Sequence, residues 1–402
     1  MNYDGGNLSQ RGKKRILVFC DSYLPSMQSG GGMWTVVNIV ERFCERYDFF
    51  VVTRNYDSKG DRRPFTTVET GEWNRVGNAR TYYLAAPDVT QQSCKQLVDD
   101  VRPDLVFLNS SMSGPCTKFL LARRRGLIDQ RIPVVLAATG ELSDGCLSEK
   151  PVKKRLYLAA ANAIDLFNGI IWKASTELEV EEIRHRAGAK SEILVAADLT
   201  PTTILPDYDA AAKPIKAKGE VTFILYSRIV PKKNLRYLLE ILQAVRKGSV
   251  TLEIVGPFEN LAYWRECEKL IDKLPPNVTA NVVGPVPYDT GLEHLFAGHF
   301  FILPTLNENF GYVFIESMAA GTPVLTSENV VWEDLEQKNA GMRIPLADTD
   351  GWRRQIEKCV DMDELEFRKT SAAARKYALD WLARPEAEEA NARVFERALG
   401  AG

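Results

Sequence analysis

Short apolar runs recur along the chain and alternate with stretches of helical periodicity. Continuous apolar runs are typical of buried parallel strands, because a half-exposed strand alternates polar and apolar residues. The helical stretches space their apolar residues at i, i+3, i+4 and i+7, as in Leu235, Leu238, Leu239 and Leu242. This alternation predicts an α/β fold with mostly parallel sheets. The runs lie at 15–20, 49–53, 104–109 and 133–138, and again at 221–227, 251–256, 280–284, 300–305 and 323–327.

Residues 200–220 separate the two sets of runs and are rich in proline, alanine and charge, which predicts a linker. A chain of 402 residues is also longer than one ordinary core supports. We therefore expect two Rossmann-like, doubly wound domains, at 1–199 and 221–375, that face a central cleft. We expect residues 376–402 to return as a helix to the first domain, because Trp381 interrupts an otherwise charged helix. Ligands of such sheets bind at the carboxyl ends of the strands, which places the site in the cleft.

Charge and cysteine content exclude several classes of protein. A net charge of −2 argues against a general nucleic-acid binder. The seven cysteines lack metal or redox spacing and read as the reduced thiols of a cytoplasmic protein. We expect no signal peptide and no transmembrane segment, because no apolar run is long enough. Residues 149–167 start basic and turn apolar, which fits either a helix that meets an anionic membrane surface or a buried helix with solvated ends.

The most informative stretch is NENFGYVFIESMAAGTPVL, residues 307–325. It follows an apolar run and predicts a strand, a turn and a helix that begins near Gly311 or Tyr312 and ends before Gly321. Gly311 lets the backbone approach a ligand, and the N–H groups of the first helical turn form an anion site that suits a phosphate.

Glu308 and Glu316 lie on either side of this turn. An ionised carboxylate accepts hydrogen bonds and cannot donate them, so it favours hydroxyl groups over phosphate. A ligand with hydroxyls on both sides of a phosphate group fits this arrangement. A nucleotide sugar has that pattern, since a diphosphate joins its ribose to its sugar.

Arg228 and Lys233 supply the cations that a departing diphosphate needs. Both follow the apolar run at 221–227, so both lie at the carboxyl end of a predicted strand; Lys232 is the neighbouring alternative to Lys233. We expect no metal and no cofactor, because none of the three Asp-x-Asp pairs follows a strand that points into the cleft. These pairs are Asp207/Asp209, Asp348/Asp350 and Asp361/Asp363.

The run E-N-F-G-Y-V-F-I-E resembles the E-x7-E signature of retaining GT-B glycosyltransferases of family 4, and S-M-A-A-G-T-P-V resembles its usual continuation. Arg228 and Lys233 match the family's R-x4-K motif. The resemblance implies that Glu316 binds the donor ribose and that Glu308 faces the donor sugar. It also implies main-chain contacts to sugar and phosphate, and to the base near two further residues. These backbone positions are Asn309, Phe310, Gly311 and Tyr312, and Gly284 and Val286 for the base. Asn309 departs from the family, which more often has glycine there.

Two loops of the first domain are further candidates. Gly30, Gly31 and Gly32 precede a predicted helix, but Thr35 breaks the dinucleotide-binding pattern of glycines. The segment is either a flexible loop or a helix N-terminus that completes the diphosphate site, and Gly31 and Gly32 match the family's glycine pair.

Thr139, Gly140 and Glu141 follow the run at 133–138, where many family members carry a histidine and a glycine. We expect these three residues to contact the acceptor or the donor sugar. The chain's histidines, His185, His294 and His299, have no evident catalytic setting.

These expectations define a glycosyltransferase that moves a hexose from a nucleotide diphosphate sugar to a glycan or lipid-linked glycan acceptor, with retention of configuration, in cell-surface polysaccharide synthesis. The alternatives are a GT-B nucleotide-sugar epimerase, which needs no acceptor, and a non-catalytic nucleotide-sugar-binding protein. The broken glycine pattern argues against a Rossmann oxidoreductase.

Overall fold

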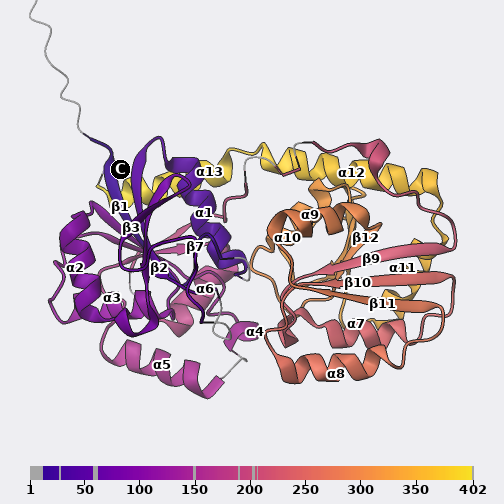
Figure 1. The fold of residues 1–402 in the computed structure, drawn as a ribbon, viewed down its shortest axis with the longest axis horizontal. Coiled ribbons are helices and arrows are strands. Elements are labelled where there is room, and N and C mark those ends of the chain that lie inside the picture. Colours follow the sequence, from indigo (N-terminus) through magenta and orange to yellow (C-terminus); the bar gives the residue numbers. More distant parts are fainter. Residues whose placement is uncertain are drawn as a thin grey trace, which may run out of the picture.

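The computed structural model describes residues 12–26, 29–57, 62–147, 151–188, 191–201, 204–205 and 207–400. They form two α/β domains side by side, each built on one sheet with helices on both faces (Figure 1). The predicted α/β class with two Rossmann-like domains is therefore confirmed.

The first sheet is parallel except where β3 pairs with β4. Its strand order is β3-β4-β2-β1-β5-β6-β7-β8, so the chain moves to one side of β1 and then returns to the other. The reversal between β1 and β5 creates a crevice at their carboxyl ends. The strands are β1 (Lys14–Cys20), β2 (Tyr47–Arg54), β3 (Trp73–Val76), β4 (Ala79–Leu84), β5 (Leu105–Asn109), β6 (Val134–Ala137), β7 (Ile171–Ala174) and β8 (Ile193–Val195).

The second sheet is parallel throughout and has the order β11-β10-β9-β12-β13-β14. Its strand order reverses between β9 and β12, so a second crevice lies at the carboxyl ends of these two strands. The strands are β9 (Glu220–Tyr226), β10 (Ser249–Val255), β11 (Val278–Gly284), β12 (Phe300–Leu303), β13 (Val324–Ser327) and β14 (Gly341–Ile344).

Helices bury both faces of the sheets. In the first domain, α1 and α13 cover one face, and α2, α3, α5 and α6 cover the other. The first-domain helices are α1 (Gly31–Phe43), α2 (Gln91–Val101), α3 (Gly114–Arg124), α4 (Asp144–Leu147), α5 (Pro151–Ala163) and α6 (Glu177–Arg186), with the 3₁₀ turn η1 (Ala86–Asp88). The later helices are α7 (Leu235–Leu242), α8 (Leu261–Ile271), α9 (Tyr288–Ala297), α10 (Tyr312–Ala319), α11 (Thr349–Asp361), α12 (Glu364–Leu382) and α13 (Glu386–Ala398), with η2 (Ala210–Ala212) and η3 (Pro231–Lys233).

All nine apolar runs are strands, but β3, β4, β7, β8 and β14 lack such a run. The strand β7 shows why, since Lys173 interrupts its apolar pattern although its side chain is only 1% exposed. Lys173 Nζ lies 3.0 Å from Asp198 Oδ1, and this ion pair makes burial of the lysine tolerable. The partner lies 25 residues away, beyond the reach of a pattern read along the chain.

The C-terminal helix does return to the first domain, but it is α13 and not the whole of 376–402. Phe395 of α13 packs against Phe43, Phe49 and Phe107 of the first domain. Trp381 belongs to α12, and its ring lies 4.7 Å from that of Trp332 in the second domain. The expectation that Trp381 marks the returning helix is therefore wrong. Trp381 instead packs against the aromatic side chains of the second domain.

The segment expected as a linker is partly packed onto the second domain. Lys213 is buried there, because its three ammonium N–H groups reach Phe296 O at 2.8 Å, Gly298 O at 2.9 Å and Thr322 Oγ1 at 2.8 Å. Burial lowers the pKa of Lys213 to about 7. A charged composition therefore did not mean a solvated linker at this position.

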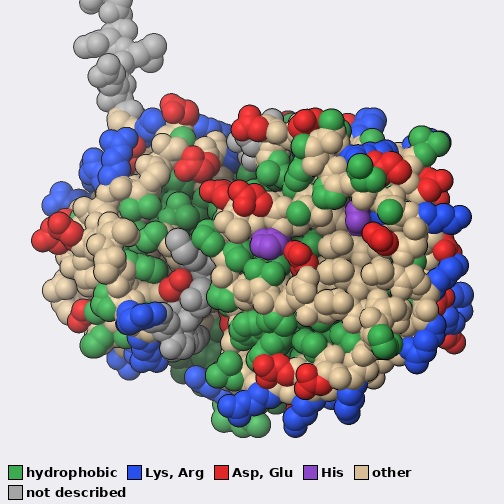
Figure 2. Space-filling view, turned by 45° about the vertical axis from the view of Figure 1, so that its right-hand side comes forward, with side chains coloured by type: hydrophobic (Ala, Val, Ile, Leu, Met, Phe, Trp, Pro, Cys, Tyr) green, Lys and Arg blue, Asp and Glu red, His purple; other side chains and the backbone are tan. Residues whose placement is uncertain are grey.

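The surface in Figure 2 carries basic and acidic side chains interspersed at its rim, in keeping with a net charge near zero. Among the described residues, no helix combines the length and the apolar character needed to cross a bilayer.

Candidate active site

The two crevices face each other across the space between the domains. The second domain contributes the segment after β9, which carries Arg228 and Lys233, and the segment after β12, which carries Glu308 and leads into α10. These segments lie on either side of the strand-order reversal. The first domain contributes the start of α1 and the loop after β6.

Lys233 and Glu308 form a buried ion pair. Their side chains are 11% and 13% exposed, and Lys233 Nζ donates to Glu308 Oε2. Burial disfavours the charged form of Glu308, but Lys233 and Lys232 outweigh this effect and hold its pKa below the ordinary value. An ammonium group has three N–H donors, so Lys233 retains donors for a second anion. The structure thus brings together two residues that lie 75 positions apart in the chain.

Two hydrogen bonds from the rest of the second domain fix the turn between the two glutamates. Trp332 Nε1 donates to Phe310 O at 3.0 Å, and Glu308 N donates to Asn329 O at 3.0 Å. Gly311 has φ +75°, and a Cβ there would lie 2.5 Å from the Phe314 ring and 2.8 Å from Glu308 Cγ. Only glycine fits this position, and α10 begins at the next residue, as predicted.

Glu316 lies on α10 with 4% of its surface exposed. Tyr288 Oη donates to Glu316 Oε1 at 3.0 Å. Burial raises the pKa of Glu316 to about 7, and this hydrogen bond only partly offsets the rise. Glu308 and Glu316 therefore differ, since the first has a cation beside it and the second has a phenol.

Arg228 belongs to the second domain and lies close to the first domain. Its guanidinium Nη1 lies 3.0 Å from Glu259 Oε2, and both side chains are substantially exposed, at 43% and 35%. A Cβ at Gly30 would lie 3.1 Å from Arg228 Nε, so the start of α1 and this guanidinium are neighbours. Burial is the main cause of the lowered pKa of Lys233, and the positive charge of Arg228 lowers it further. The same charge adds to the lowering of the pKa of Glu308 by the two lysines.

Gly31 and Gly32 form the first turn of α1, not a flexible loop. A Cβ at Gly31 would lie 3.4 Å from the Tyr312 ring, so the N-termini of α1 and α10 meet across the cleft. Asn109 at the end of β5 donates to Gly32 O at 2.6 Å and fixes this turn. Two helix N-termini beside Arg228 are an arrangement that suits a phosphate, and the binding of a diphosphate there stays a prediction.

The loop after β6 reaches the same turn. A Cβ at Gly140, which has φ +74°, would lie 3.0 Å from Asn309 Cβ, so the predicted loops of the two domains are in contact. Thr139 also has positive φ, at 52°. Glu179 of α6 fixes this conformation, because its carboxylate accepts from Gly140 N at 2.5 Å and Ser175 N at 2.6 Å.

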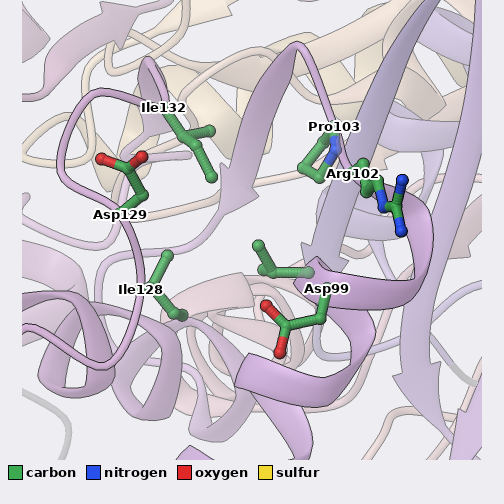
Figure 3. Close-up of a pocket in the computed structure, with 7 residues that line it drawn as sticks. Asp99, Arg102, Pro103, Ile128, Asp129 and Ile132 are labelled. Carbon is green, nitrogen blue, oxygen red and sulfur yellow. The ribbon is translucent and has the colours of Figure 1, made fainter.

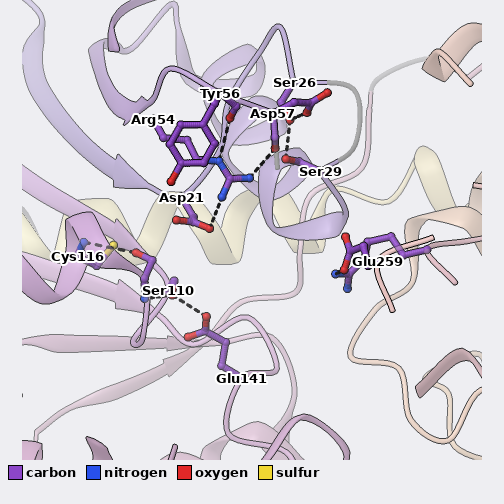
Figure 4. Close-up of polar contacts among 12 residues, drawn as sticks. Asp21, Ser26, Ser29, Arg54, Tyr56, Asp57, Ser110, Cys116, Glu141 and Glu259 are labelled. Carbon is purple, nitrogen blue, oxygen red and sulfur yellow. Dashed lines mark hydrogen bonds and ion pairs between the residues drawn. The ribbon is translucent and has the colours of Figure 1, made fainter. Parts of the chain in front are cut away.

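Glu141 faces its own domain (Figure 4). Its carboxylate accepts from Ser110 Oγ at 2.6 Å, from Ser111 N at 2.7 Å, from Ser111 Oγ at 2.9 Å and from Met112 N at 3.2 Å. These bonds shape the loop after β5. A direct contact of Glu141 with a sugar therefore stays a prediction.

Gly284 and Val286 lie where β11 ends and α9 begins. Gly284 has φ +82°, and a Cβ there would lie 3.6 Å from the Phe258 ring. Val286 is partly buried against the second core. The contacts of these residues with a base stay a prediction.

A hollow of about 480 Å³ elsewhere in the first domain is not part of this site (Figure 3). Its lining includes Arg102, Pro103 and Ile132, which precede β5 and β6. It therefore lies at the amino ends of the strands, opposite the cleft. No group of three or more histidine, cysteine or acidic residues placed to hold a metal occurs in the described parts of the chain. The absence of a metal from the reaction stays a prediction.

Sequence reasoning missed five residues that build the site: Trp34, Asn109, Glu179, Tyr288 and Trp332. Asn109 could have been found, because a polar residue ends an apolar run there. The other four lie on helices or in a long loop, and their roles depend on what they meet in space.

Two facing Rossmann-like domains define the GT-B class of architecture. Residues 209–378, most of which lie in the second domain, match the family model of glycosyl transferases group 1. The lipopolysaccharide core biosynthesis glycosyltransferase LpsE of Rhizobium meliloti is 29% identical over 183 residues, which are 45% of this chain. The match spans about half, 51%, of that relative's length.

Solved structures show the same fold over nearly the whole chain. Sucrose-phosphate synthase from Thermosynechococcus elongatus has a TM-score of 0.71 at 18% identity and covers 97% of this chain and 100% of its own. HepE from Anabaena, solved in complex with UDP-glucose, has a TM-score of 0.65 at 18% identity and covers 95% of this chain and 98% of its own. At these identities the likeness establishes the GT-B fold.

Proposed function

We propose that this protein is a retaining glycosyltransferase that moves a hexose from a nucleotide diphosphate sugar to a saccharide or lipid-linked saccharide acceptor. One observation carries the proposal. Lys233 pairs with Glu308 beside the charge of Arg228, at the point where two helix N-termini meet between the domains, and Glu316 lies one turn into the second of these helices.

The proposed donor lies mainly on the second domain. Its diphosphate would lie between Arg228, Lys233 and the N-termini of α1 and α10, where fixed positive charge is concentrated. Its ribose hydroxyls would donate to Glu316, and its sugar would lie between Glu308 and the Thr139–Gly140 loop. The protein named HepE binds UDP-glucose in a structure with the same fold, which supports a nucleotide sugar as the ligand class.

In the proposed reaction, the bond between the anomeric carbon and the diphosphate oxygen breaks, and the acceptor oxygen bonds to that carbon on the same face. The acceptor's proton passes to the departing phosphate oxygen. Arg228 and Lys233 stabilise the negative charge that develops on the diphosphate, and this stabilisation is greatest in the transition state. Glu308, kept ionised by Lys233, is placed to favour the positive charge that develops on the sugar ring.

We further propose an acceptor in cell-surface polysaccharide synthesis and a cytoplasmic location, at times on the membrane surface. The match to a lipopolysaccharide core glycosyltransferase supports this assignment. In α5, Val152 and Leu156 are 70% and 67% exposed and lie beside the exposed cations Lys153 and Arg155, a combination that suits the surface of an anionic membrane.

A thermal-shift panel of UDP-, GDP- and ADP-sugars tests the donor first. The donor that fits should raise the melting temperature, since ligand that binds only the folded state stabilises it. The same nucleotide sugar should then release free nucleotide only when a saccharide acceptor is present. Conversion of the nucleotide sugar without any acceptor would indicate an epimerase. Binding without turnover across a broad acceptor panel would indicate a sensor.

A further inference from the structure

Glu316 is a buried carboxylate surrounded by phenols. Burial raises the pKa of three tyrosines, and the charge of Glu316 adds to the rise in each: Tyr226 of β9, Tyr288 of α9 and Tyr312 of α10. Tyr288 donates to Oε1, and Asp289 is the charged group next to Tyr288 in the chain. Burial and the Tyr288 hydrogen bond account for the pKa of Glu316, with no contribution from a cation.

Tyr288 is held from its other side by the first domain. The ring of Trp34 in α1 lies 4.5 Å from the ring of Tyr288, tilted by 44°. Trp34 is partly buried and packs against the cores of both domains. One residue further on, Thr35 Oγ1 lies 3.4 Å from Tyr312 Oη. A chain of contacts therefore runs from Glu316 through Tyr288 to the first domain.

We propose that Tyr288 is a positioning residue for the donor: its hydroxyl engages Oε1 of Glu316 and leaves Oε2 for the ribose hydroxyls, and Trp34 holds Tyr288 in this place from the opposite domain. The ribose subsite is then complete only when the two domains are closed on each other. This inference rests on the proposed function, because it assigns further residues to the same donor site.

The physical reason is the cost of a buried, unpaired carboxylate. An ionised Glu316 can accept a hydrogen bond from a ribose hydroxyl. A hydrogen bond from a neutral donor such as a phenol favours the ionised form of the carboxyl group. Without the Tyr288 hydroxyl, Glu316 would ionise at higher pH and its side chain would be free to turn. Trp34 acts indirectly, since it contacts the Tyr288 ring and not the carboxylate.

The test compares Tyr288→Phe with Tyr237→Phe. Tyr237 is a matched control, because it also lies in the second domain and its hydroxyl also makes one hydrogen bond, to Leu346 O at 2.7 Å. Calorimetric titration with UDP, GDP and ADP identifies the nucleotide that binds the wild type. The corresponding 2′,3′-dideoxynucleoside diphosphate serves as the probe without ribose hydroxyls.

We expect Tyr288→Phe to weaken binding of the ribonucleotide about tenfold, the scale of one hydrogen bond to a charged group. Binding of the dideoxy probe should be the same in both variants. The pH at which affinity is half-maximal should be higher in Tyr288→Phe than in the wild type, a change that a merely structural role would not produce.

Trp34→Ala tests whether Trp34 holds Tyr288 in place, and this variant should also bind the ribonucleotide more weakly. Its control is Trp73→Ala in β3, whose indole Nε1 donates to Asp100 outside the cleft. Melting temperatures show that each variant folds. If Tyr288→Phe binds the ribonucleotide as well as Tyr237→Phe, with the same pH midpoint, the inference is wrong and the proposed function stands. If the wild type binds none of the three nucleotides, both fail.

Discussion

Two largely buried carboxylates of the first domain and two of the second domain make different kinds of contact. On the first domain, the oxygens of Glu141 and Glu179 accept hydrogen bonds from backbone N–H and serine hydroxyl groups of neighbouring loops. On the second domain, Glu308 has a lysine and Glu316 has one tyrosine hydroxyl. A carboxylate whose lone pairs are satisfied by its own domain shapes a loop. One with lone pairs to spare in a cleft is available for a ligand.

The largest effect should come from Lys233→Ala. Loss of the ammonium removes charge from the diphosphate site, and we expect kcat/KM to fall by about 10³-fold. The variant also leaves Glu308 buried without its partner, which should lower the free energy of unfolding by ~3 kcal/mol. Steady-state kinetics and urea unfolding measure the two losses. Lys232→Ala is the matched control. Equal losses in both variants would show that Lys233 contributes no more to catalysis or stability than its neighbour.

Arg228→Ala should separate catalysis from stability. Because the pair with Glu259 is substantially exposed, unfolding should change by no more than about 0.5 kcal/mol. The rate constant kcat should fall by roughly 10²-fold, since the guanidinium matters most in the transition state. Arg236→Ala on α7, whose side chain is 56% exposed and pairs with Glu240, gives the background. An unchanged kcat in Arg228→Ala would contradict the mechanism.

Glu316→Gln should make the protein more stable while weakening its binding of the donor. Folding raises the pKa of Glu316 from 4.5 to about 7, so the folded state holds this proton more tightly than the unfolded state. Stability is therefore lost as the pH rises from about 4.5 to about 7, and glutamine avoids that loss. At pH 8 the variant should gain about 3 kcal/mol in unfolding free energy, and below pH 4.5 nothing.

Unfolding by urea at pH 4.5 and pH 8 measures this gain, and calorimetric titration measures the affinity for the nucleotide. A variant that is no more stable at pH 8 than the wild type would show that the buried carboxylate carries no such cost.

The smallest effect on activity should come from Glu141→Gln. A glutamine NH₂ group would face backbone N–H donors at Ser111 and Met112, which should cost ~1–3 kcal/mol of stability. Turnover should fall less than tenfold, because the carboxylate shapes its own loop. Thermal unfolding measures the loss of stability, and steady-state kinetics on the same preparation measure the loss of turnover. A large loss of kcat at unchanged stability would instead make Glu141 a sugar ligand and end the contrast between the two domains.

Much of the fold and half of the site could be predicted because they depend on neighbours in the chain. Apolar runs identified nine strands, and the glycines at 311 and 321 marked the ends of α10, since these features reflect local backbone and burial requirements. The spacing within two short motifs singled out Arg228, Lys233, Glu308 and Glu316, because each motif is a run of neighbouring residues. Their arrangement was also partly implied, because residues that follow parallel strands meet at one edge of a sheet.

Only the tertiary structure decided which groups are partners. Lys173 and Lys213 are buried, because Asp198 and three distant oxygens satisfy their ammonium groups. Glu141 read as a ligand contact, and its acceptors are taken by a loop 30 residues away. A hydrogen bond or ion pair depends on distances of about 3 Å between atoms, and sequence spacing carries no such information across domains. The sequence thus determined where the chemistry gathers, and folding determined which of those groups remain free to act.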